Sequence, residues 1–129
     1  MARKNALALG LGRIEFLLGD WLEPVNGRSF DLIVSNPPYI AADDPVLSTG
    51  ALRHEPRLAL TPGADALASL LSITRAASRY LERHGWLLLE HGAEQAPAVA
   101  RELVARGFRY VRSHRDLAGH ERMTEAQRN

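Results

Sequence analysis

Short apolar runs alternate along the chain with longer segments in which apolar residues recur every three or four positions. The run at residues 30–35 lacks polar alternation, which is typical of a strand in a parallel sheet covered on both faces. The periodic segments predict amphipathic helices. Predicted strands cover residues 14–18, 30–35, 86–90 and 108–114, with a candidate fifth strand at 122–124, and predicted helices cover residues 2–9, 65–83 and 94–106.

This alternation predicts an α/β fold with a mostly parallel sheet. Pro37 and Pro38 follow the second predicted strand directly, and they end its hydrogen bonding because proline has no N–H donor. Residues 40–63 then show no sustained period and contain several turn-forming clusters. A long irregular segment inside a compact domain is usually functional, so we expect residues 40–63 to form part of a site.

Composition narrows the class of protein. The 129 residues fit one domain, and 46% hydrophobic and 24% charged residues are typical of a globular protein. A net charge of +1 argues against nucleic-acid binding through bulk phosphate neutralisation. The absence of cysteine excludes disulfides and thiolate chemistry, and the five histidines show no ligand spacing, so no metal site is expected. No apolar run is long enough to span a membrane, and we expect a cytoplasmic protein.

The segment Asn36-Pro37-Pro38-Tyr39 carries the candidate chemistry. It lies at the carboxyl end of a strand, where open α/β sheets bind their ligands. The Asn36 side-chain carbonyl and the Pro37 backbone carbonyl can accept the two hydrogens of a planar amino group, while Tyr39 offers an aromatic face. That arrangement directs the nitrogen lone pair at an electrophilic methyl group, with catalysis by positioning and electrostatics. A rigid turn is the simpler alternative.

The four-residue motif occurs together with Gly19-Asp20-Trp21 and with residues 53–60, 87–92 and 115–122. In this combination the chain resembles the peptide chain release factor N(5)-glutamine methyltransferases, the HemK/PrmC family, over nearly its whole length. The resemblance implies a Rossmann-like class I methyltransferase fold that uses S-adenosylmethionine. It also implies release factors as protein partners, with the glutamine amide of their Gly-Gly-Gln loop as substrate.

Site residues on the substrate side follow from this resemblance. Asn36 would contact both the cofactor and the substrate amide, and Pro37, Pro38 and Tyr39 would complete the substrate pocket. Arg53 and Glu55 would shape the substrate side; a solvated surface ion pair is the alternative for these two.

Site residues on the cofactor side follow in the same way. Asp20 would accept a hydrogen bond from the adenine amino group, and Trp21 would pack on the adenine ring. Ordinary core packing remains open for Trp21, and a turn that ends a strand remains open for Asp20. At the position of His54 many release-factor enzymes have an aromatic residue, and a histidine there resembles the related enzymes that methylate a ribosomal protein. The substrate therefore stays open between a release factor and a ribosomal protein.

Parts of such an enzyme are missing from the sequence. We expect the fold to lack its first two strands, the glycine-rich cofactor loop and the N-terminal helical domain. Gly10 and Gly12 do not supply that loop, because they follow a predicted helix rather than a strand. We therefore expect residues 1–129 to be the C-terminal portion of a methyltransferase catalytic domain.

Two other functions stay open. A nucleic-acid methyltransferase that modifies adenine N6 or guanine N2 uses the same four-residue motif, but it would need a basic, aromatic-rich surface. A non-catalytic remnant that serves as an interaction module is the third possibility, and the missing glycine-rich loop favours it.

We expect the isolated chain to bind S-adenosylmethionine weakly or not at all. Without the first two strands, the strands predicted at 14–18 and 30–35 lose their neighbours and leave apolar edges that favour instability or association. Titration calorimetry tests this expectation, and tight stoichiometric binding would contradict it.

Overall fold

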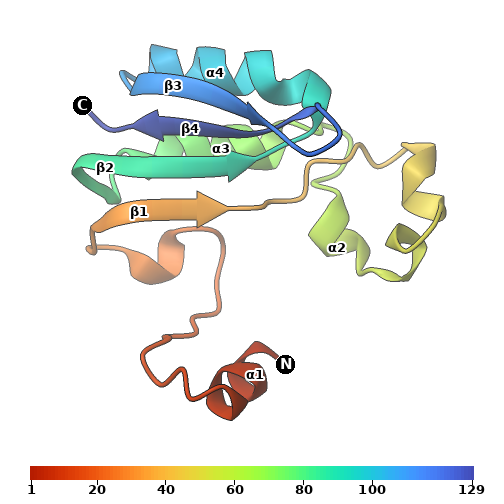
Figure 1. Cartoon of the computed structure of the whole chain (residues 1–129), viewed down its shortest axis with the longest axis horizontal. Coiled ribbons are helices and arrows are strands. Elements are labelled where there is room, and N and C mark those ends of the chain that lie inside the picture. Colours follow the sequence, from red (N-terminus) through yellow and green to blue (C-terminus); the bar gives the residue numbers. More distant parts are fainter.

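The computed structural model describes all 129 residues. Its centre is a four-stranded sheet in the order β1-β2-β4-β3 (Figure 1). Strand β1 (Phe30–Ser35) runs parallel to β2 (Leu81–Glu90), whereas β4 (Glu121–Gln127) runs antiparallel to both β2 and β3 (Arg109–Arg115). The sheet is therefore mixed.

Two helices, α3 (Ala68–Ala77) and α4 (Ala96–Ala105), pack against one face of the sheet. Ile33 pairs with Leu87, and Leu87 pairs with Ala126, so three adjacent strands present apolar side chains to these helices. Burying this surface from water is the main stabilising contribution to such a core. The buried cluster comprises Ile33, Leu70, Ile73, Ala77, Leu81, Leu87, Leu89, Val99, Leu103, Phe108 and Ala126.

The opposite face of the sheet is open near β1. Leu32 and Val34 alternate with Ile33, and these two residues are 52% and 66% exposed. β1 also has a strand partner on one side only, so its outer edge presents unpaired backbone groups.

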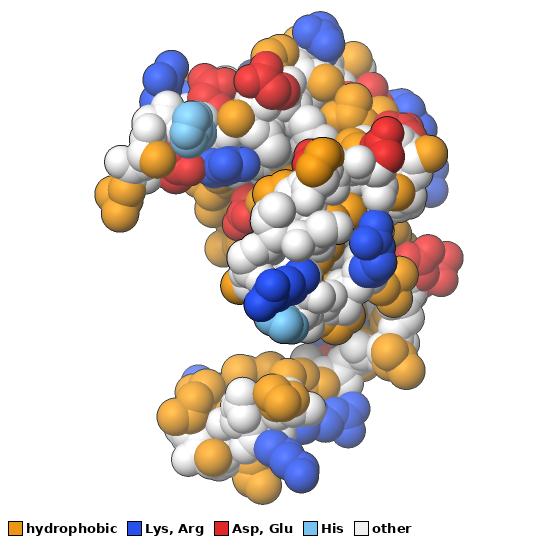
Figure 2. All heavy atoms as spheres, turned by 90° about the vertical axis from the view of Figure 1, so that its right-hand side faces the viewer, with side chains coloured by type: hydrophobic (Ala, Val, Ile, Leu, Met, Phe, Trp, Pro, Cys, Tyr) orange, Lys and Arg blue, Asp and Glu red, His pale blue; other side chains and the backbone are white.

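The N-terminal segment, residues 1–18, lies apart from the sheet and carries helix α1 (Ala2–Ala8) (Figure 1). Hydrophobic side chains gather on the surface of this separate lobe (Figure 2). An ion pair of 2.7 Å between Arg28 and Glu15 connects it to the loop before β1. Its exposed apolar side chains include Leu7, Leu9, Leu11, Ile14, Leu17 and Leu18.

The connections between the main elements contain short helical turns. These are η1 (Glu23–Val25), η2 (Pro45–Ser48), η3 (Leu52–His54), α2 (Arg57–Leu60) and η4 (Ala93–Gln95). The irregular segment predicted at 40–63 is thus a folded excursion beyond the end of β1, made of η2, η3 and α2 (Figure 1).

Several predicted elements are confirmed. The strand at 30–35 is β1 without change, the helix at 2–9 is α1, the helix at 94–106 corresponds to η4 and α4, and the strand at 108–114 is β3 shifted by one residue.

The strand predicted at 14–18 is wrong. These residues have no sheet partner, and their pattern of apolar residues cannot form a strand without a neighbouring ladder. The expectation of a mostly parallel sheet is also wrong, because only the β1–β2 pair is parallel.

Two boundaries differ because sheet pairing overrides local pattern. The helix predicted at 65–83 ends at Ala77, since Leu81 pairs with Phe30 and starts β2 five residues before the predicted Trp86. The short candidate strand at 122–124 is the seven-residue β4, which lies between β2 and β3. Because β4 contains several polar residues, the sequence pattern did not indicate a strand in the middle of the sheet.

We predict that Gly85→Ala destabilises the fold by about 1–3 kcal/mol, the usual cost of forcing extra atoms into a packed site. A Cβ atom at Gly85 would lie 3.0 Å from the carbonyl oxygens of Glu82 and Phe30 and 3.1 Å from that of Asp31. Urea unfolding followed by circular dichroism measures the change. Gly12→Ala is the control, because a Cβ atom there meets nothing within 4 Å; equal stability of the two variants would contradict the prediction.

Candidate active site

The Asn36–Tyr39 loop leaves the sheet where β1 ends. Ser35 pairs with Leu89, and the two prolines that follow Asn36 have no N–H with which to extend the ladder. Pro37 is buried, which anchors the loop, whereas the Asn36 side chain is exposed and makes no hydrogen bond within the chain. The loop thus presents a free carboxamide on a fixed backbone.

Tyr39 is held at both its backbone and its side chain. Its hydroxyl donates a 2.9 Å hydrogen bond to Glu90 Oε1 at the end of β2. Burial raises the pKa of the Tyr39 hydroxyl, the Glu90 carboxylate raises it further, and the nearby Arg122 guanidinium opposes the rise. Tyr39 is therefore a neutral phenol near pH 7, fixed as a hydrogen-bond donor.

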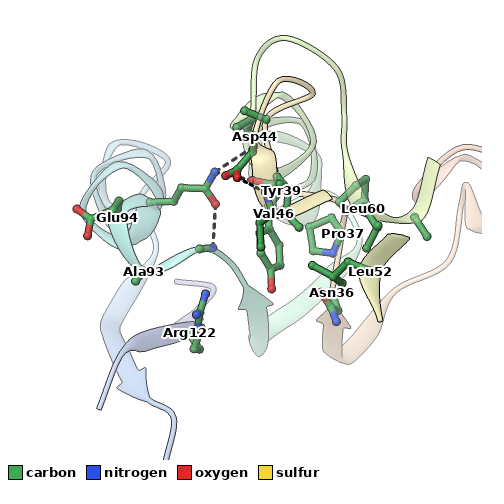
Figure 3. Close-up of a pocket in the computed structure, with 17 residues that line it drawn as sticks. Asn36, Pro37, Tyr39, Asp44, Val46, Leu52, Leu60, Ala93, Glu94 and Arg122 are labelled. Carbon is green, nitrogen blue, oxygen red and sulfur yellow. Dashed lines mark hydrogen bonds between the residues drawn. The ribbon is translucent and has the colours of Figure 1, made fainter. Parts of the chain in front are cut away.

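The Gln95 side chain joins three loops around the site. Gln95 Oε1 accepts a 2.9 Å hydrogen bond from the Gly92 amide. Gln95 Nε2 donates to the carbonyl of Tyr39 at 2.9 Å and to the carbonyl of Ala66 at 3.2 Å. Figure 3 draws hydrogen bonds among the cavity residues as dashed lines near Tyr39. Since both amide hydrogens and the amide oxygen are used, this residue fixes the loop relative to α4.

A cavity of about 690 Å³ opens beside the loop, within the usual size of ligand pockets. Figure 3 shows Asn36 and Arg122 on either side of the Tyr39 ring at this cavity. Its walls come from the segments that follow β1 and β2, from the excursion of residues 40–63 and from the start of β4. Those walls are formed by Asn36, Pro37, Pro38, Tyr39, Ile40, Ala41, Asp44, Val46, Leu52, Ala59, Leu60, Ala66, Gly92, Ala93, Glu94, Gln95 and Arg122.

A second cavity of about 550 Å³ adjoins the first, and Pro38 lines both. Asp20 and Trp21 line this second cavity, so the structure brings the two residues assigned to the cofactor side next to the loop. Its remaining walls are Gly19, Leu58, Thr61, Pro62, Ala68, Ser69 and Ser72.

The turn that presents Trp21 has constrained geometry. Trp21 has φ of +43°, a backbone conformation that residues other than glycine seldom adopt, and the residue is 41% exposed. At Gly19 an added Cβ would lie 2.2 Å from Pro24 Cγ, so only glycine fits there. Packing of the turn against Pro24 therefore fixes the approach of Asp20 and Trp21.

Arg53 and Glu55 lie outside both cavities. Both are exposed, and neither lines a cavity wall, although their neighbour Leu52 does. Arg53 Nε donates a 2.9 Å hydrogen bond to His54 Nε2 rather than pairing with Glu55. The structure therefore leaves these two side chains on the rim of the excursion.

Three residues had no role in the sequence-based prediction: Gln95 and Arg122, which line the larger cavity, and Glu90, which accepts the hydrogen bond of Tyr39. Glu90 and Arg122 lie within segments that carry the family resemblance, but nothing in the sequence places them beside Tyr39. Gln95 carries no sequence signal, since a glutamine near the start of a helix is unremarkable. Pairing of β2 with β4 brings these regions together.

Buried hydrogen bonds join the end of β2 to β4 next to the site. Since the Gly92 carbonyl can only accept, His91 Nδ1 donates to it at 3.0 Å. His91 Nε2 then accepts from the Thr124 hydroxyl at 2.8 Å, and Ser113 lies 3.2 Å from the same hydroxyl. His91 and Thr124 are fully buried, so these bonds lock the end of β2 to β4.

No group of three or more His, Asp or Glu side chains is placed to hold a metal ion. None of the helices has the length and apolar character needed to cross a membrane.

Comparison with known proteins supports the resemblance. The chain is 46% identical over 127 residues, 98% of its length, to the release factor glutamine methyltransferases of Pseudomonas aeruginosa and Yersinia pestis. It is 42% identical over 128 residues to that of Vibrio cholerae. The chain spans 46%, 46% and 45% of the lengths of these relatives. No family model matches it.

Two solved structures are similar. A release factor-specific protein-(glutamine-N5) methyltransferase from Alicyclobacillus acidocaldarius aligns with 80% of this chain and 51% of its own, at 30% identity and a TM-score of 0.50. TrmN from Thermus thermophilus aligns with 99% of this chain and 32% of its own, at 23% identity and a TM-score of 0.61. The second match concerns the fold alone.

We predict that Gln95→Glu is less stable than the unaltered chain by about 1–3 kcal/mol, because it leaves polar groups unsatisfied at a part-buried position. A carboxylate would face the carbonyls of Tyr39 and Ala66 without a hydrogen to donate. That environment raises the pKa of the introduced carboxyl, so the destabilisation is greatest above this pKa and shrinks as the pH falls and the carboxyl is protonated.

Unfolding measured at pH 8 and pH 4 tests the Gln95 prediction. A negative charge near the start of α4 would by itself stabilise the helix by about 0.3–1 kcal/mol, so the two effects have opposite signs. Glu94→Gln, at the exposed neighbouring position, is the control. A Gln95→Glu variant as stable as the original at pH 8 would contradict the role assigned to this clamp.

Proposed function

We propose that this chain, a homologue of release factor glutamine methyltransferases, takes part in methyl transfer from S-adenosylmethionine to the side-chain amide of a glutamine. The proposed substrate is the Gly-Gly-Gln loop of a peptide chain release factor. The observation that carries the proposal is the position of the Asn36–Tyr39 loop, which separates two cavities at the end of β1 and leaves the Asn36 carboxamide free.

The second cavity fits the adenosine part of the cofactor. It offers the Asp20 carboxylate as an acceptor for an exocyclic amine, the Trp21 ring for stacking, and the hydroxyls of Thr61, Ser69 and Ser72. When bound, S-adenosylmethionine supplies an electrophilic methyl group. By the resemblance Asp20 and Trp21 would border the adenine, and the cavity that both residues line supports this proposal.

The larger cavity suits the acceptor amide. Asn36 and Pro37 line it, so the side-chain oxygen of the first and the backbone carbonyl of the second can accept the two hydrogens of a primary amide. Engaging both hydrogens orients the nitrogen lone pair away from the loop. Buried Pro37 and the clamped Tyr39 hold these acceptors still, which is how positioning lowers a barrier.

Tyr39 acts through its ring rather than as a base. Its hydroxyl stays protonated because burial and Glu90 raise its pKa, and its hydrogen is already donated to Glu90. The ring provides a flat surface for the amide. No strong base is required, since the amide proton becomes acidic only as the nitrogen–methyl bond forms.

The roles proposed for Arg53 and Glu55 concern the rim of the site. Both side chains are exposed on the excursion beyond β1, next to Leu52 in the cavity wall. A protein substrate, unlike a free amide, would extend over this rim and reach them.

We predict that Asn36→Ala lowers the rate of methyl transfer at least about 100-fold. Loss of one preorganised hydrogen-bonding group has an effect of this size in other active sites. The side chain is exposed and without a hydrogen-bond partner, so unfolding free energy should change by no more than about 0.5 kcal/mol. Transfer of a labelled methyl group to purified release factor measures activity, at cofactor concentrations high enough to offset weak binding.

The same assay separates the alternatives. Labelling of DNA or RNA in place of release factor would favour the nucleic-acid methyltransferase. Labelling of a ribosomal protein would identify that protein as the substrate, the alternative left open by His54. A folded chain that labels none of these would favour the non-catalytic interaction module. Labelling of release factor by Asn36→Ala at the original rate would remove Asn36 from the mechanism.

A further inference from the structure

We propose that Arg122 binds a main-chain carbonyl oxygen of the peptide segment that carries the reactive amide. This inference rests on the proposed function, and it adds a contact to the acceptor side of the site. Arg122 lines the larger cavity across from Asn36, with the Tyr39 ring between them (Figure 3). It is the sole Lys or Arg among the cavity walls.

The Arg122 side chain is oriented in advance by the turn between β3 and β4. Arg122 Nε donates a 3.1 Å hydrogen bond to Asp116 Oδ2. The other carboxylate oxygen of Asp116 accepts from the amides of Ala118 at 2.9 Å and His120 at 3.0 Å. These hydrogen bonds lower the pKa of Asp116 and keep its carboxylate charged, and the bond from the His120 amide has the largest effect.

The backbone of Arg122 is fixed as well. Its carbonyl accepts a 2.9 Å hydrogen bond from the amide of His91, which follows β2. Only Nε of the guanidinium is engaged, so the two terminal amino groups have no partner in the chain. The side chain is 41% exposed, which leaves these donors open to a molecule in the cavity.

The charges around the cavity indicate the chemistry of the partner. Asp44 and Glu94 also line it, so its walls carry two carboxylates against one guanidinium, and an anionic ligand would be repelled. A neutral acceptor meets no such penalty. A Gly-Gly-Gln segment has no charged side chain, and its main-chain carbonyls are the acceptors that a guanidinium can reach on both sides of the reactive residue.

Two uncharged probes test the inference: acetyl-Gly-Gly-Gln-amide, and the shorter butanamide, which keeps the side-chain amide of glutamine but has no main-chain carbonyl. Binding to the chain is measured by NMR titration. We expect Arg122→Ala to weaken binding of the longer probe about tenfold, as for loss of a hydrogen bond from a charged donor. Binding of the shorter probe should stay within about twofold, because the proposed contact is absent from it.

Three further variants make the test specific. Arg122→Lys should recover part of the affinity, since it keeps the charge but lacks the planar fork. Asp116→Asn should weaken only the longer probe, because it releases the guanidinium from its orientation. Arg101→Ala, an exposed arginine of α4 outside the site, is the matched control and should change neither probe. Circular dichroism confirms that each variant is folded.

The outcomes separate this inference from the proposed function. Equal weakening of both probes by Arg122→Ala would assign Arg122 a purely structural role and overturn the inference. Loss of binding in Asn36→Ala, without loss in Arg122→Ala, would overturn it while supporting the acceptor site. Tighter binding of inorganic phosphate than of the longer probe would show that the guanidinium binds anions instead. Failure of the unaltered chain to bind either probe would overturn both proposals.

Discussion

The site depends on the end of a single hydrogen-bonded ladder. β1 and β2 run side by side until Ser35 pairs with Leu89, and the two prolines after Asn36 cannot continue that pairing. The chain must leave the sheet at this point, with its backbone stiffened by the prolines. Both cavities lie against this part of the chain, because Pro38 lies in the walls of both.

Distant parts of the sequence complete the larger cavity. Antiparallel pairing of β2 with β4, together with the buried bond between His91 and Thr124, holds the start of β4 beside the end of β2. The Gln95 side chain then links the start of α4 to the Tyr39 carbonyl. The walls of the larger cavity are therefore held by contacts from the sheet and from the start of α4, in addition to the stiff prolines of the loop.

The sequence predicted the parts that depend on local pattern. The apolar run of β1 and the prolines after it are evident from residue types alone, and so was the candidate role of Asn36. The strand expected at 14–18 failed because a strand needs a neighbour, which no local pattern reveals. Arg122 and Gln95 were missed for a related reason: their importance comes from what the tertiary fold places beside them.

The shared wall at Pro38 has a thermodynamic consequence. A ligand that shifts this proline on entering one cavity changes the shape of the other, so the two binding free energies are linked. Linkage is reciprocal: whatever factor the first ligand applies to the affinity of the second, the second applies to the first. A stiff proline wall keeps that factor close to one, which would let two ligands enter in either order.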